Sequence, residues 1–246
     1  MIKLYEAKNH ILIHTDQIHP AEHRHSAAHI IISMGEKMRV YVDGDEYQCN
    51  GIFIPSGCSH FINTNKSEML VFLYDNTTSV ATQMKETKIL NDVVCESIRK
   101  KYSSFEKRHT FHLYKKFENV LLEQLGIEQA KESIMDERIL SAIKHMRKFA
   151  KETLTCKAVA DAVLLSESRF SHLFKEQVGM TYAAYLIYQR IMHVYMQVVN
   201  GKTITEAAIE AGFSSSSHFA DVNRRVFGIP ASDVIKDLEF IKIAEI

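Results

Sequence analysis

The stretch "HPAEHRHSAAH" carries four histidines within eleven residues, from His19 to His29. Neutral imidazole is the commonest protein ligand for a transition metal. His23 and His25 stand two residues apart, and side chains two apart on an extended strand point to the same side. This spacing indicates a pair of imidazoles that could hold a metal ion or another effector together.

Such histidines need a rigid frame, and the first eighty residues predict one built of strands. The short runs rich in β-branched and aromatic residues are "HILIH" (10–14), "RVYVDG" (39–44), "GIFIPSG" (51–57) and "MLVFLYD" (69–75). Asp43-Gly44 is typical of a two-residue hairpin turn, because both central positions of that turn need a positive φ. The spacing of runs and turns predicts an antiparallel sandwich or barrel over residues 1–80.

From about Val80 the apolar residues follow a helical period. Ile139, Ile143, Met146 and Phe149 fall on one face of a helix that Asp136 could cap. Helices around 85–125, within a linker or dimerisation segment 81–133, either cover the barrel or supply a dimer surface, and both readings stay open. The whole chain is predicted to be α+β, with an all-α C-terminal part over 134–246.

That C-terminal part contains one pattern twice, about fifty residues apart. Each copy has a helix start, a short helix, a tight turn, a serine cap, a second helix and a glycine. In the first copy Thr155 and Ser166 are the expected caps, and Gly179 ends the second helix. In the second copy Thr203 and Glu206 form a capping box.

Gly212 suits the left-handed end of the first helix of the second copy, where Phe213 can fill the angle between the helices, and Gly228 ends the second helix. Two short helices joined by such a turn make a helix-turn-helix. Helical hairpins are common and most bind no DNA, so one copy alone would be weak evidence. Two copies, over about 156–178 and 204–227 and joined by a helix over 182–200, favour DNA binding.

Both copies resemble the paired helix-turn-helix domain of AraC/XylS-type transcription regulators over roughly residues 135–238. The matching residues are Ala160, Ser166, Phe174, Lys175, Gly179 and Tyr185, then Ile204, Ala208, Gly212, Phe213, Phe219, Arg225, Phe227, Gly228 and Pro230. The resemblance implies that the second helix of each copy enters the major groove, with the two about one turn of DNA apart, ~34 Å.

The resemblance also implies which residues meet DNA. Candidates for base contacts are Ser168, Ser171 and His172 in the first copy and Ser216, Ser217 and Ala220 in the second. Arg169, Lys175, Arg224 and Arg225 are expected near phosphates, and Ser215 completes the DNA-binding candidates. Because serine discriminates bases poorly, we expect the first copy to carry most of the sequence reading.

The chain departs from the family pattern at four positions. Asp221 stands where a basic residue is usual, and Asn223 replaces a phenylalanine. Leu164 occupies a turn position where glycine or asparagine is normal. Pro230 comes one residue earlier than in the commonest pattern.

The N-terminal part resembles a cupin barrel over roughly residues 10–75. His23, His25 and His29 match the first cupin metal motif, and "GIFIPSGCSH" matches the second and supplies His60. The resemblance implies an effector or metal site at these four histidines, with a divalent transition metal as one candidate occupant. Sensor cupins also keep such histidines without a metal, so this alternative stays open. His10 and His19 lie outside the motif and are expected at the surface.

We therefore expect a DNA-binding transcription regulator that responds to an effector, and not an enzyme. The alternative is a metal-dependent cupin enzyme fused to a DNA-binding domain, which needs an acid or base group beside the metal. Glu22 is the carboxylate nearest the first motif, and nothing marks it as catalytic. By analogy with the family, we expect an activator.

The charge and hydropathy of the chain limit the kinds of partner that we expect. The chain has 246 residues with 30 basic and 30 acidic side chains. The N-terminus lacks the apolar run of a signal peptide and no stretch has membrane-spanning length, so we expect a cytoplasmic protein without a membrane partner. Residues 151–246 carry ten basic against eleven acidic residues. We therefore expect weak non-specific binding to double-stranded DNA and a homodimer that raises the affinity.

Overall fold

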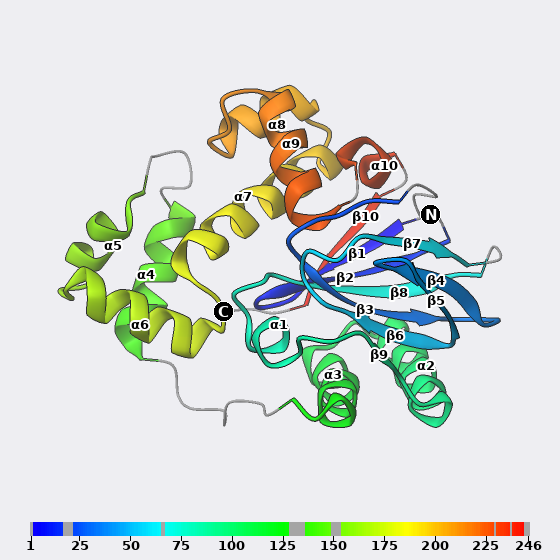
Figure 1. Cartoon of the computed structure of the whole chain (residues 1–246). Coiled ribbons are helices and arrows are strands. Elements are labelled where there is room, and N and C mark those ends of the chain that lie inside the picture. Colours follow the sequence, from blue (N-terminus) through cyan, green and yellow to red (C-terminus); the bar gives the residue numbers. More distant parts are fainter. Residues whose placement is uncertain are drawn as a thin grey trace. The chain divides into compact units, whose positions relative to one another are not determined.

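The computed structural model describes residues 2–16, 22–64, 67–127, 136–148, 154–228, 230–236 and 238–243 (Figure 1). The chain divides into two units. The first comprises Met1–Gln129 together with Arg224–Glu245, and the second comprises Ala130–Asn223 with Ile246. The predicted α+β class is confirmed, because the first unit is built on strands and the described part of the second is helical.

The strands of the first unit form two sheets. The seven-stranded sheet has the order β10 (Leu238–Lys242), β1 (Ile2–Glu6), β2 (His10–Thr15), β8 (Met69–Tyr74), β3 (Ala28–Ser33), β6 (Gly51–Ile54) and β9 (Lys88–Ile89). The three-stranded sheet has the order β5 (Asp45–Cys49), β4 (Met38–Val42) and β7 (His60–Asn63). The four predicted runs all form strands, but the two sheets are not joined into one closed barrel.

The strands are antiparallel except for β1 and β10, which run parallel. Strand β10 was not predicted, since the C-terminal part reads as helical throughout. Its pairing with β1 explains why residues 224–245 group with the first unit. The hairpin between β4 and β5 turns at Asp43 (φ 48°) and Gly44 (φ 96°), as their residue types predict.

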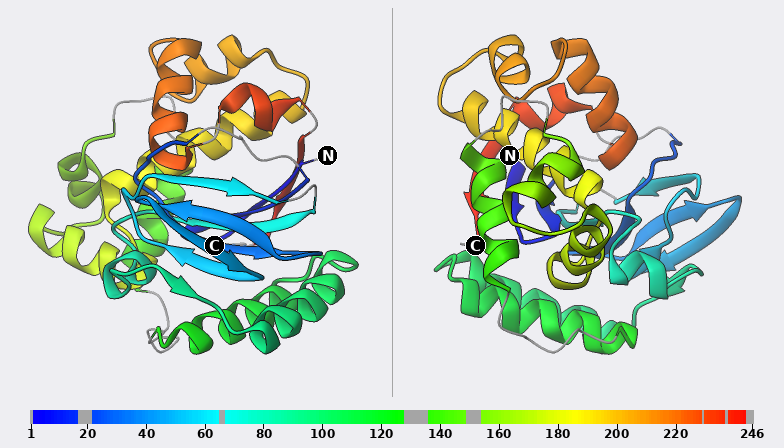
Figure 2. Two further views of the ribbon diagram at one scale, coloured as in Figure 1. Left: turned by 45° about the vertical axis from the view of Figure 1, so that its right-hand side comes forward. Right: turned by 90° about the vertical axis from the view of Figure 1, so that its left-hand side faces the viewer.

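Two long helices cover one face of the seven-stranded sheet. Helices α2 (Asp92–Glu106) and α3 (Phe111–Leu125) lie side by side along it (Figure 2). Tyr102 of α2 and Phe117 of α3 share one buried apolar core with Ile30 and Phe72 of the sheet. Of the two roles left open for residues 85–125, covering the sheet is the one that this packing supports. The short α1 (Ser79–Gln83) precedes them.

The expectation that His10 lies at the surface is wrong. Its side chain is 2% exposed, stacks on Tyr74 with 4.4 Å between ring centroids, and shares a hydrogen bond with the Tyr114 hydroxyl. Strand β2 directs it into the core beneath α3, where burial lowers the pKa of His10 to about 4. His19 lies outside the described residues.

The remaining helices follow in chain order. They are α4 (Glu137–Lys148), α5 (Cys156–Ala162), α6 (Glu167–Val178), α7 (Tyr182–Val199), α8 (Ile204–Glu210), α9 (Ser216–Phe227) and α10 (Ala231–Ile235). In α4, Ile139, Ile143 and Met146 are buried as predicted, and Asp136 accepts a hydrogen bond from the Arg138 backbone N–H at 2.9 Å. Phe149 lies outside the described residues. None of the described helices is both long and apolar enough to cross a membrane.

Candidate functional site

The first helix-turn-helix, called the first motif below, consists of α5 and α6. Thr155 Oγ1 accepts a hydrogen bond from the Ala158 backbone N–H at 3.1 Å, and Ser166 Oγ accepts one from that of Arg169 at 3.3 Å. Gly179 ends α6 in the left-handed conformation. These caps and this stop were predicted, and they place the two helices of the motif on the expected residues.

The turn of the first motif contains a strained residue. Leu164 has φ 57°, and its side chain is 92% exposed. A left-handed backbone is unfavourable for a residue with a Cβ. The unusual leucine therefore keeps the backbone conformation that glycine or asparagine would adopt more easily.

One face of α6 is fixed by aromatic packing. Phe170 and Phe174 are fully buried, with ring centroids 5.7 and 5.8 Å from that of Tyr182 in α7. Because this face is buried against the linking helix, the opposite face of α6 remains open for a ligand.

The open face of α6 carries most of the predicted contact residues. Ser168, Arg169, His172 and Lys175 are exposed. Nδ1 of His172 lies 3.8 Å from a carboxylate oxygen of Glu176, one turn further along. Ser171 is half-buried, and its Oγ lies 3.3 Å from Sγ of Cys156 in α5. Ser171 is thus less accessible than the other four.

The second helix-turn-helix, called the second motif below, consists of α8 and α9. The capping box between Thr203 and Glu206 is present in both directions, at 3.2 and 3.0 Å. Gly212 has φ 84°. Phe213 is buried, and its ring centroid lies 5.4 Å from that of Phe219. It therefore fills the angle between the two helices, as predicted.

The predicted contact residues of α9 offer short side chains. Ser217, Ala220, Arg224 and Arg225 are exposed, whereas Ser215 and Ser216 are half-buried. Ser215 Oγ accepts a hydrogen bond from the backbone N–H of His218 at 3.0 Å. Ser215 therefore caps α9, which leaves its hydroxyl less free for a base.

The departure at Asn223 has a structural partner that the sequence analysis missed. Asn223 is fully buried, and its Oδ1 accepts a hydrogen bond from the Tyr195 hydroxyl at 2.8 Å. Tyr195 belongs to α7 and is itself 1% exposed. A buried polar pair thus links α9 to α7 at the position where the resemblance predicts a phenylalanine. The polar residue at 223 was the one signal for it.

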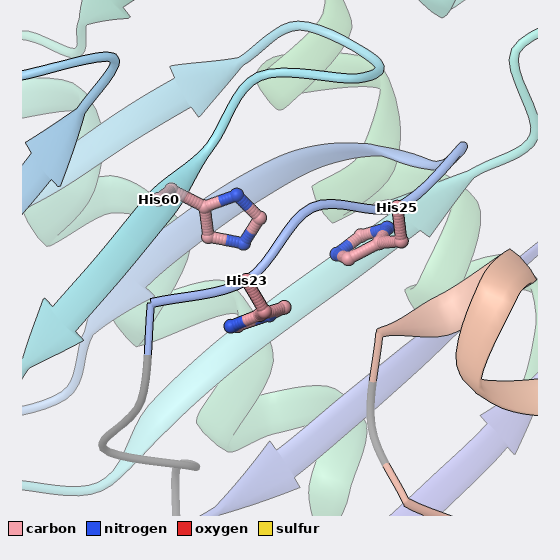
Figure 3. A group of neighbouring side chains, drawn as sticks. All are labelled: His23, His25 and His60. Atoms are coloured by element: carbon pink, nitrogen blue, oxygen red, sulfur yellow. The ribbon is translucent and has the colours of Figure 1, made fainter.

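The four histidines of the cupin-like pattern meet in the first unit, and we call them the histidine cluster. His23, His25 and His60 point toward one another from the segment before β3 and from the start of β7 (Figure 3). One ring nitrogen from each of these three lies within 4.8 Å of the other two. His29, on β3, completes the group, with its ring centroid 4.3 Å from that of His25 and 4.7 Å from that of His60.

The backbone fixes two of these side chains relative to each other. His23 and His60 form an antiparallel bridge, with the two N–H groups donating to the opposite carbonyls at 3.0 and 2.9 Å. Nδ1 of His60 lies 3.0 Å from the Cys58 carbonyl, so it carries the proton and donates it. This leaves Nε2 of His60 with a lone pair, as a metal ligand requires.

The cluster suits a metal by its unpaired nitrogens and its charge. Among the described residues, neither Nδ1 of His29 nor Nε2 of His60 has a hydrogen-bond partner. Burial lowers the pKa of His25 to about 3 and that of His60 to about 4, and it also lowers that of His29. Lowered pKa values favour the neutral form of His25, His29 and His60, which is the form that binds a metal.

Glu22 is not directed at the cluster. Glu22 is exposed, and its side chain accepts a hydrogen bond from the Ser59 hydroxyl at 2.7 Å. Within the described residues, the group that could hold a metal contains imidazoles alone. The geometry thus brings together three imidazoles that could hold a metal ion, and it pairs Glu22 with Ser59.

Comparisons with known proteins match the C-terminal part by sequence. A family model described as "Helix-turn-helix domain" matches residues 159–237. The virulence regulon transcriptional activator VirF of Yersinia enterocolitica and the thermoregulatory protein LcrF of Yersinia pestis are each 32% identical over 106 residues. These matches cover 43% of this chain and 35% of each relative, so the similarity spans about a third of their length.

Solved structures match over nearly the whole chain. ToxT of Vibrio cholerae O395 has a TM-score of 0.52 at 9% identity, over 92% of this chain and 96% of that one. ToxT from strain SCE256 with a bound unsaturated fatty acid has a TM-score of 0.52 at 11% identity, over 96% and 94%. At such low identity these matches show a shared fold.

Together the caps, the turns, the linking helix and the matched segment agree with the resemblance drawn from the sequence. The C-terminal part of this chain contains a helix-turn-helix domain, and the structure shows two copies of the motif in it.

Proposed function

We propose that this chain is a sequence-specific, DNA-binding transcription regulator whose N-terminal part responds to an effector. The observation that carries the proposal is the pair of helix-turn-helix motifs on one linking helix, each with a buried aromatic face and an exposed polar face. A recognition helix needs this arrangement, because one face must be held by the protein while the other reaches bases.

The two motifs contribute differently to the proposed contact. Ser168 and His172, exposed on α6, are the proposed base contacts of the first motif. Arg169 and Lys175, also exposed, are its proposed phosphate contacts. On α9, Ser216, Ser217 and Ala220 offer little discrimination between bases. Arg224 and Arg225, both exposed, are assigned to phosphates.

The histidine cluster is the proposed effector site, and a divalent transition metal is its proposed occupant. His23, His25 and His60 would hold the ion, with His29 beside them. When bound, the ion would supply a fixed positive charge that orders the segment carrying His23 and His25. A small organic effector is the second candidate, supported by the fatty acid bound to ToxT, which shares the fold.

An enzyme built on this cluster has less support. Metal-assisted catalysis needs an open coordination position and an acid or base group beside it. The relatives matched by sequence are named as regulators, and Glu22 is engaged with Ser59. Activation, a homodimer and a cytoplasmic location remain predictions, the first supported by the name of VirF.

The proposal is tested by selecting bound sequences from random double-stranded DNA with the full chain, in separate runs with Zn²⁺, Co²⁺, Ni²⁺ and a chelator. We expect enrichment of a common site with two contact elements about one turn of DNA apart, ~34 Å. Failure to enrich any sequence under every condition would contradict the DNA-binding proposal.

The effector half of the proposal has its own test. Elemental analysis of the wild type, purified without added metal, is compared with that of His60→Ala. We expect about one bound ion per wild-type chain and a large loss in the variant. An altered response of DNA binding to metal in His60→Ala, without any turnover, would support a sensor over an enzyme.

A further inference from the structure

The segment that carries two histidines of the cluster also contacts the end of a proposed recognition helix. Ser26 follows His25 directly in the chain. Its backbone N–H and its Oγ each donate a hydrogen bond to the Arg225 carbonyl, both at 3.1 Å. All residues of this contact belong to the first unit, because its second segment begins at Arg224. The last turn of α9 is thus anchored beside a candidate metal ligand.

Gly228 makes the contact closer than any other residue could. It ends α9 with φ 74° and is buried. A Cβ placed on it would lie 2.0 Å from Cδ2 of His25 and 2.5 Å from its Nε2. No side chain fits in that space, so the backbone of Gly228 packs directly on the edge of the His25 ring.

His25 therefore belongs to two contacts at once. Its ring lies against Gly228, and it is also one of the three imidazoles whose nitrogens lie within 4.8 Å of one another. A bound metal ion would fix the orientation of this ring, and the ring orientation decides whether Gly228 fits against it. Two events that depend on one side-chain position must influence each other's free energy.

We propose that metal binding to the histidine cluster is coupled to the packing of the last turn of α9, Arg224–Gly228, against His25 and Ser26. We call the turn seated when it makes these contacts. The inference rests on the proposed function, since it takes the cluster as the effector site and α9 as a recognition helix. Metal stabilises the seated turn, because the three imidazoles already converge while the turn is seated. Arg224 and Arg225, the proposed phosphate contacts, lie in this turn.

The test compares two glycines that differ in one respect. Gly228 and Gly126 each follow a helix with φ 74°. A Cβ on Gly126 meets nothing within 4 Å, whereas one on Gly228 meets His25. Gly228→Ala and Gly126→Ala therefore carry the same backbone strain, and Gly228→Ala alone disturbs the cluster.

The first measurement is Co²⁺ binding to the full-length variants, followed by the visible absorption of the bound ion. We expect Gly228→Ala to weaken Co²⁺ binding by about tenfold, within the usual range of coupling between two sites. We expect Gly126→Ala to bind Co²⁺ as the wild type does. Circular dichroism confirms that both variants are folded, and Ser26→Ala provides a milder change at the same contact.

The second measurement is hydrogen exchange of the peptide containing Arg224–Gly228, with and without metal. We expect metal to slow its exchange by about fivefold or more in the wild type and to have a smaller effect in Ser26→Ala. Metal binding that leaves this exchange unchanged, with equal Co²⁺ affinity in both alanine variants, would overturn the coupling while the metal site stands. No metal binding to the wild type would overturn the coupling and the metal site together, and neither result bears on whether the chain binds DNA.

Discussion

The two helix-turn-helix motifs share a plan and differ in what they expose. The first motif presents His172 with Ser168, Arg169 and Lys175 on one open face, while the second presents serines and Ala220. In the second motif, a buried hydrogen bond between Asn223 and Tyr195 also links α9 to the linking helix α7. From this difference we predict that the first motif discriminates bases and that the second fixes the position of the protein on DNA.

The largest expected effect is that of Asn223→Ala, which removes the hydrogen bond between Asn223 and Tyr195. The substitution leaves the Tyr195 hydroxyl buried without its acceptor, so we expect the free energy of unfolding to fall by about 2–3 kcal/mol. Denaturant unfolding of the full chain measures it. Ser217→Ala, on the exposed face of the same helix, is the control and should change stability by less than about 0.5 kcal/mol. Equal stability of the two variants would show that the hydrogen bond between Asn223 and Tyr195 does not stabilise the second motif.

Base discrimination is tested by His172→Ala against Ser217→Ala. We expect His172→Ala to weaken binding to the selected site by about 1–3 kcal/mol and binding to random DNA far less. Ser217→Ala should have a small effect on both. Titrations of labelled duplexes at one fixed salt concentration measure the affinities. Equal losses on both DNAs for His172→Ala would remove His172 from base reading.

The positioning role of the second motif is tested by Arg225→Ala. A phosphate contact carries no sequence information, so the affinity for selected and random DNA should fall alike, by about 1 kcal/mol. The slope of log affinity against log salt should become shallower by about one unit. An unchanged slope would count against a phosphate contact.

The smallest effect concerns the turn of the first motif. Leu164 is left-handed and 92% exposed, so Leu164→Asn relieves strain without losing packing. We expect a gain of about 0.5–1 kcal/mol in the free energy of unfolding. Thermal or denaturant unfolding measures it, and a loss of stability would show that the exposed side chain has a packing role.

Local rules predicted much of the DNA-binding part. Thr155, Ser166 and Thr203 cap helices as their types and spacing indicate, and Gly179, Gly212 and Gly228 end helices in the left-handed conformation. These features depend on a few neighbouring residues, so a single sequence reveals them. The convergence of His23, His25 and His60 needed the resemblance to a cupin in addition, because His60 is distant along the chain.

Features that depend on distant partners could not be predicted. Strand β10 forms because it pairs with the edge strand β1, and the sequence of residues 238–242 does not indicate this pairing. His10 is buried because α3 covers its strand, and Asn223 is tolerated because Tyr195 lies opposite. The contact between Gly228 and His25 joins residues about two hundred positions apart. Each of these is a tertiary effect on a residue whose local signal is weak.

The central claim is that two unequal motifs on one linking helix read neighbouring turns of DNA. The most direct measurement substitutes every base pair of the selected site in turn and records the affinity of the full chain. We predict two contacted segments about one turn apart, with losses of about 1–3 kcal/mol per base pair in the segment assigned to the first motif by His172→Ala and smaller losses in the other. A single contacted segment, or two that respond equally, would contradict the account.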